Sequence, residues 1–186
     1  RGGGAAGSTA RPPYTATRVF DKLSGINDRG RRRGLKDASR SMIAPGRGGS
    51  SVNGSSQASL VALNGHISYG SSKAALDNIT RVCALELGQY NIRVNSVNPT
   101  VVMSEMSQFY WGRPEIGEPY LAQMPLHRWA TENDIAGPIA FLPGEDAAMI
   151  PGVSLPLAGR YTNRCRQAPT GFPRRRHRPP RPARSA

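Results

Sequence analysis

Apolar positions in the middle of the chain recur at two different spacings. Between Ser68 and Leu87 they follow the i, i+3, i+4 rule, which predicts an amphipathic helix. Asn91 to Val97 alternates between apolar and polar residues, which predicts a strand closed by Pro99. Shorter strands are expected at Val52–Ser56 and Val153–Leu157. A helix is expected at Thr131–Leu142, where Thr131 and Asp134 have the spacing of an N-terminal capping pair. Strands that alternate with helices predict an α/β fold with a parallel sheet.

The segment before this region has a weaker pattern. Asp28 to Ile43 has helical character, but Arg31, Arg32 and Arg33 crowd it and Gly34 weakens it. Gly46 to Ser51 is expected to form a turn, and 104–126 a loop with a short helix.

Charge divides the chain into three parts. The net charge of +13 comes from +8 in residues 1–47, −3 in residues 48–162 and +8 in residues 163–186. We therefore expect a degenerate Gly/Pro-rich segment at 1–19, a folded part at 20–162 and a disordered Arg/Pro-rich tail at 163–186.

Composition excludes several classes of protein. Cys83 and Cys165 form neither a disulfide framework nor a metal-ligand pattern. No apolar run approaches the length of a membrane span, and no targeting signal is seen, so a cytoplasmic location is the default expectation. The arginines at 174–178 could contact phosphates, but no nucleic-acid-binding motif appears. A basic nucleic-acid-binding protein is therefore a less favoured alternative, and no specific nucleic acid is expected.

Tyr69 and Lys73 form the central chemical motif. On a helix these two residues share one face, so the ammonium would lie beside the phenol. A neighbouring cation favours the phenolate, which suits the pair to general acid/base work on a carbonyl or alcohol oxygen. Taken alone, the spacing also fits an ordinary surface pair on a helix.

The surroundings of this motif resemble the short-chain dehydrogenase/reductase family. Ser56 precedes Tyr69 by 13 residues at the end of a predicted strand, and Asn95-Ser-Val-Asn-Pro99 follows the helix. The resemblance implies the C-terminal part of a doubly wound, Rossmann-like parallel sheet. It implies that Ser56 binds the substrate oxygen, that Tyr69 transfers the proton, and that Lys73 lowers the Tyr69 pKa and holds the nicotinamide ribose. An ungapped match from Phe20 places Asn27 on the family's catalytic Asn, although an ordinary loop Asn would look the same.

Further residues follow from the same resemblance. Val102 and Ser104 fall on positions that hold the nicotinamide carboxamide of NADP (NADPH). Within the family, the run Val97-Asn-Pro-Thr-Val-Val-Met103 is similar to the dicarbonyl/L-xylulose reductases. This implies reduction of L-xylulose or an α-dicarbonyl, with Leu63, His66 and Trp111 lining the substrate pocket. His66 could equally be an exposed loop residue, and Trp111 a core residue.

The family's Gly-rich pyrophosphate turn, Thr-Gly-x-x-x-Gly-x-Gly, finds no match here. We expect the first three strands, most of the fourth and the residues that choose between NAD and NADP to be absent. An inactive truncated remnant that cannot bind the dinucleotide is therefore the main alternative. Family members form homodimers or homotetramers through the Tyr-bearing helix and the helix before it. The arginines at 31–33 put that assembly in doubt.

Overall fold

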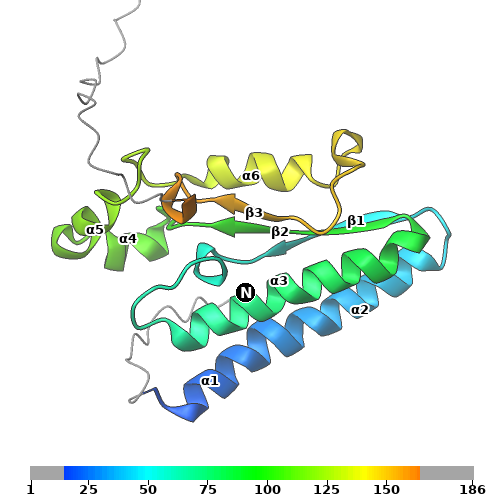
Figure 1. Cartoon of the computed structure of the whole chain (residues 1–186), viewed down its shortest axis with the longest axis horizontal. Coiled ribbons are helices and arrows are strands. Elements are labelled where there is room, and N and C mark those ends of the chain that lie inside the picture. Colours follow the sequence, from blue (N-terminus) through cyan, green and yellow to red (C-terminus); the bar gives the residue numbers. More distant parts are fainter. Residues whose placement is uncertain (1–14, 164–186) are drawn as a thin grey trace, which may run out of the picture.

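The computed structural model describes residues 15–163, which form a small α/β unit (Figure 1). Its sheet has three parallel strands, β1 (Gly49–Gly54), β2 (Ile92–Pro99) and β3 (Ser154–Leu157), in that order. Gly49 pairs with Ile92 at one end of the first ladder, and Ser96 pairs with Ser154 at the start of the second. The predicted α/β class and parallel sheet are confirmed.

Helices cover both faces of the sheet. On one face lie α1 (Thr17–Ser24), α2 (Gly30–Ile43) and α3 (Ile67–Leu87), and on the other lies α6 (Glu132–Phe141) (Figure 1). Two short helices, α4 (Glu105–Trp111) and α5 (Pro114–Leu121), lie beyond the carboxyl ends of the strands. Ligands of open α/β sheets bind at this end, so these two helices border the expected site.

One apolar cluster joins α2 and α3 to β2. Leu35, Ala84, Ile92 and Val94 are buried together, with Cys83 among the partly buried residues around them. Cys83 thus occupies the small hydrophobic position that its helical spacing predicts, and burial raises the pKa of its thiol. The three consecutive arginines of α2 are exposed, so the helix forms without burying their charge.

Two local predictions were wrong. Strand β1 covers 49–54 instead of 52–56, because its Gly and Ser residues complete the backbone ladder with β2 despite low strand propensity. The expected turn at 46–51 is correspondingly shorter. The helix expected from Asp28 begins at Thr17 and runs through a π-helical segment, Gly25–Arg29, into α2. Neither Gly30 nor Gly34 stops it.

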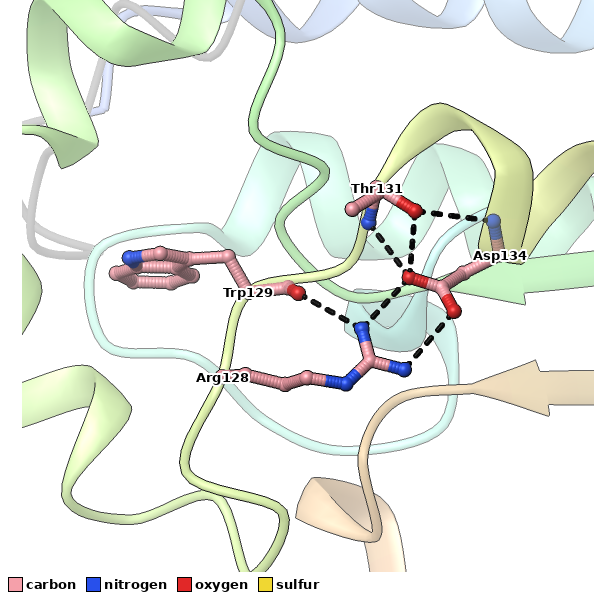
Figure 2. A network of polar contacts seen from close by, with 4 residues as sticks. All are labelled: Arg128, Trp129, Thr131 and Asp134. Atoms are coloured by element: carbon pink, nitrogen blue, oxygen red, sulfur yellow. Dashed lines mark hydrogen bonds and ion pairs between the residues drawn. The ribbon is translucent and has the colours of Figure 1, made fainter. Parts of the chain in front are cut away.

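Helix α6 is fixed at its N-terminus by the predicted capping pair. Thr131 accepts from the Asp134 backbone N–H, and the Asp134 carboxylate accepts from the Thr131 N–H (Figure 2). Arg128 adds two hydrogen bonds to the same carboxylate, at 2.7 and 2.9 Å, and a third to the Trp129 carbonyl. These contacts hold the pKa of Asp134 well below its ordinary value.

The C-terminus of α6 is fixed by a residue from the sheet. The Arg93 guanidinium donates to the carbonyls of Leu142, Ala147, Pro143 and Gly144 at 2.5 to 3.0 Å. Strand alternation marks Arg93 only as a polar position. In the structure its guanidinium connects β2 to the segment that follows α6, whose Gly144 and Ala147 carbonyls also accept backbone hydrogen bonds.

Several expectations concern residues that the structure does not describe. The tail at 163–186 and the segment at 1–19 fall largely outside residues 15–163, as does Cys165. The proposed division into three parts stays a prediction. Among the helices that the structure describes, none combines the length and apolarity needed to cross a membrane.

Candidate functional site

Tyr69 and Lys73 lie in the first two turns of α3, as the helical spacing predicts. The Lys73 Nζ atom lies 5.7 Å from the centroid of the Tyr69 ring. It donates a hydrogen bond of 2.9 Å to the backbone oxygen of Gly54, the last residue of β1. The lysine is 9% exposed, so the ammonium is fixed between the helix and the strand end.

Ser56 lies just beyond β1, in a tight turn against the Tyr-bearing helix. Its side chain accepts from the backbone N–H of Ala58 at 3.2 Å and so caps the 3-10 turn Gln57–Ser59. A Cβ atom at Gly70 would lie 2.9 Å from the Ala58 backbone oxygen. The missing side chain at Gly70 therefore lets the turn that carries Ser56 approach the helix that carries Tyr69.

Asn27 reaches the same helix from the opposite side. It lies in the π-helical segment, and its side-chain amide donates to the Ser72 hydroxyl at 3.1 Å. That hydroxyl in turn donates to the Tyr69 backbone oxygen at 2.8 Å. The structure thus places Asn27 in a helix and links it to the turn between Tyr69 and Lys73.

The electrostatic environment of Lys73 is unusual for a lysine. Its pKa is lowered, first because burial penalises the charged ammonium and second because the Arg31 guanidinium repels it. Asp77, one turn further along α3, acts in the opposite direction. A cation that is both buried and constrained is available for charge stabilisation at this strand end.

Asp77 is the main site residue that the sequence analysis missed. It is 2% exposed and accepts hydrogen bonds from Ser59 at 2.5 Å, Ser96 at 2.9 Å and Asn98 at 2.7 Å. Asn98 also donates to the Ser56 backbone oxygen at 3.2 Å. The signal for this network was present, because Asp77 follows Lys73 by four residues and shares its helix face.

The expected pocket residues divide into two places. His66 lies beside Tyr69, with its ring centroid 6.4 Å away and its Nδ1 atom 2.8 Å from the Asn64 oxygen. Trp111 lies in an aromatic cluster and contacts Tyr120 and Trp129, with ring centroids 4.8 and 6.2 Å away. Leu63 packs against the same cluster. A side-chain hydrogen bond between Gln57 and the Tyr120 hydroxyl connects this cluster to the Ser56 turn.

Two open cavities lie near these elements. The smaller, about 240 Å³, is lined by Trp111, Trp129 and Met103. Trp111 therefore has both of the environments considered for it, a packed core face and a cavity wall. The larger, about 420 Å³, lies between Arg128 and the turn at 158–160, and none of the expected site residues lines it.

Val102 and Ser104 lie in the loop between β2 and α4. The Ser104 hydroxyl takes part in the capping box of α4, and the Val102 backbone oxygen accepts from Ser107 at 2.6 Å. Within residues 15–163, the Val102 backbone N–H donates no hydrogen bond. This leaves one backbone donor at the strand end for an external acceptor.

Known proteins resemble most of this chain. A family model described as enoyl-(acyl carrier protein) reductase matches residues 4–162. L-xylulose reductase of Caenorhabditis elegans is 46% identical over 115 residues, covering 62% of this chain and 46% of that protein. Human L-xylulose reductase is 40% identical over 143 residues, covering 77% of this chain and 59% of that protein. The chain therefore spans about half the length of these curated relatives.

Solved structures agree with the fold. A short-chain dehydrogenase/reductase from Mycobacterium ulcerans aligns with a TM-score of 0.81 and 27% identity, over 84% of this chain and 57% of that one. ElxO with NADP bound aligns at 0.77 and 30% identity, over 84% of this chain and 63% of its own. An NAD⁺-bound xylitol dehydrogenase also aligns at 0.77 and 30%, over 82% and 64%. The family model, the relatives and the strand-end site together show that the chain belongs to the short-chain dehydrogenase/reductase family.

Proposed function

We propose that this chain carries the proton-transfer part of an NADPH-dependent carbonyl reductase that converts L-xylulose or an α-dicarbonyl to an alcohol. One observation supports this most directly: Tyr69, Lys73 and Ser56 gather where β1 ends, with Lys73 bound to the backbone of Gly54. The relatives named L-xylulose reductase support the substrate class.

The residues present fit the nicotinamide end of a dinucleotide. An ammonium has three donors, and Lys73 uses one of them on Gly54, which leaves two for ribose hydroxyls. The Val102 N–H and the Ser104 hydroxyl lie on the loop expected to face the carboxamide. A bound NADPH supplies the hydride for the reaction.

Each side chain then has a defined task. Ser56 holds the carbonyl oxygen of the substrate, and Tyr69 gives it the proton when the alcohol forms. Lys73 stabilises the resulting phenolate through its nearby positive charge. Asn27 supports the Tyr-bearing turn through Ser72. His66 contacts the substrate from beside Tyr69, and Leu63 and Trp111 contact it from the aromatic cluster.

A direct test is NADPH oxidation at 340 nm by the purified chain with diacetyl and with L-xylulose. We expect Tyr69→Phe to lower kcat by at least about 100-fold, since general acid catalysis contributes about that much or more. The matched control is Tyr90→Phe, because Tyr90 is 45% exposed after the end of α3. Turnover that survives in Tyr69→Phe would contradict the proposal.

A second candidate is an inactive remnant that cannot bind the dinucleotide. The sequence favours it in one respect, since it contains no run of the form Thr-Gly-x-x-x-Gly-x-Gly to hold the pyrophosphate. No turnover with either substrate, together with no NADPH-induced rise in melting temperature, would support this candidate over the first.

A further inference from the structure

Five basic residues form a continuous stripe on the outer face of the α2 region. Arg29, Arg32, Arg33, Lys36 and Arg40 follow the i, i+3, i+4, i+7, i+11 spacing of one helix face. All five side chains are exposed. We call this set the α2 basic stripe.

The stripe carries charge that the fold leaves uncompensated. Within residues 15–163 the only ion pair joins Arg128 to Asp134 at the start of α6, which lies on the other face of the sheet. None of the five side chains donates a hydrogen bond to another residue in that range. Exposed cations without acidic partners are free to bind an external polyanion.

The geometry of the stripe is rigid. Leu35 and Ser39 of α2 are buried at 6% and 9% exposure, and Leu35 belongs to the cluster that packs against β2. From Arg29 to Arg40 the helix advances roughly 16 Å at 1.5 Å per residue. A duplex carries one phosphate per strand about every 3.4 Å of its axis, but each strand winds around that axis, so the straight stripe can contact only the phosphates that face α2.

The residue types in α2 favour double-stranded nucleic acid over a lipid surface, a protein partner or a single strand. A helix that inserts into a lipid surface needs an exposed apolar face, and α2 exposes no large hydrophobic side chain because that face packs into the core. Protein partners need buried apolar or aromatic anchors, which the stripe lacks. Single strands are bound by stacking on aromatic rings, and α2 contains no aromatic residue.

We propose that the α2 basic stripe binds the phosphate backbone of double-stranded nucleic acid without reading its sequence. The proposal does not use the Tyr69 site and stands apart from the reductase function.

The test is fluorescence anisotropy of a labelled 20-base-pair DNA duplex titrated with the full chain at several salt concentrations. The stripe variant replaces Arg32, Arg33, Lys36 and Arg40 with Gln, a good helix former. The control variant replaces four of the eight tail arginines, at 174, 175, 176 and 178, with Gln, so the stripe variant and the control variant each have a net charge of +9. Circular dichroism checks that the fold is kept.

We expect the stripe variant to lose at least about 10-fold in affinity, and the slope of log K against log salt to become shallower by about three to four. The tail variant should lose less. Equal losses in the two variants, or a larger loss in the tail variant, would overturn the proposal.

Two further measurements identify the contact and the partner. Lysine acetylation should be slowed by duplex at Lys36 and unchanged at Lys22, which is exposed on α1. Acetylation of Lys36 at an unchanged rate would overturn the proposal. Phosphatidylserine vesicles provide the competing partner, and stripe-dependent binding to vesicles without binding to duplex would overturn the assignment to nucleic acid.

Discussion

At the scale of single residues, Asp77 connects the parts of the site that come from different segments of the chain. Its carboxylate accepts from the turn after β1, through Ser59, and from strand β2, through Ser96 and Asn98. Because Asn98 also contacts the Ser56 carbonyl, Asp77 helps to fix the position of the Ser56 turn.

Replacing Asp77 with Ala should lower the free energy of unfolding by about 2–4 kcal/mol, since the buried Ser96 and Asn98 and the partly buried Ser59 lose an acceptor. Urea unfolding monitored by circular dichroism measures this. Asp37→Ala is the matched control, because Asp37 is exposed on α2, and it should change stability by less than about 0.5 kcal/mol. Similar small losses in both variants would show that the network does not stabilise the fold.

The sequence predicted Tyr69 and Lys73 as a pair because both lie on one face of a single helix. It did not reach the hydrogen bond of Lys73 to Gly54 or the network around Asp77, because these bring together residues 18 or more positions apart. Helical spacing shows which residues share a face. It does not show which strand end that face will meet.

At the scale of elements, boundaries that depend on a local pattern were predicted more accurately than those that depend on pairing between distant segments. Helix α3 was predicted within one residue of its start, since its apolar pattern repeats over several turns. Strand β1 was predicted three residues late, because its pairing with β2 and not its own composition determines where it begins. The capping residues of α6 were predicted correctly, because the Thr131 and Asp134 signal is local.

Arg93 shows how strand β2 positions an element on the other face of the sheet. We predict that Arg93→Ala lowers the free energy of unfolding by about 2–3 kcal/mol, since three carbonyls just after α6 and that of Ala147, in the 3-10 turn Glu145–Ala147, lose a charged donor. Hydrogen exchange should also become faster in 138–147 than in α3. The control is Arg81→Ala, whose exposed side chain makes one hydrogen bond of 3.4 Å. Equal effects of the two substitutions would contradict the role given to Arg93.

At the scale of the whole molecule, the chain spans only part of the length of the relatives and solved structures that it matches. The sheet between residues 15 and 163 has three strands, and the chain aligns with 57% to 64% of the three solved structures compared above. The nicotinamide end has candidate contacts in Lys73, Val102 and Ser104. We expect no partner for the pyrophosphate among these 186 residues, because they contain no run of the form Thr-Gly-x-x-x-Gly-x-Gly. Binding energy from that turn and its helix N-terminus would then be missing.

The strength of NADPH binding through the nicotinamide-end contacts can be measured as the rise in melting temperature that NADPH causes. We predict that 1 mM NADPH raises the Tm of the 186-residue chain by no more than about 2 °C. A dissociation constant of about 1 mM stabilises by about 0.4 kcal/mol, whereas one of about 1 μM would add about 4 kcal/mol and shift Tm by roughly 10 °C. Lys73→Met is the control for binding at the nicotinamide end, and it should remove whatever small shift remains. A shift near 10 °C that Lys73→Met abolishes would instead show that the strand-end site binds the dinucleotide without the turn. That outcome would contradict the predicted weak binding, whereas binding at about 1 mM still permits the proposed turnover at millimolar NADPH.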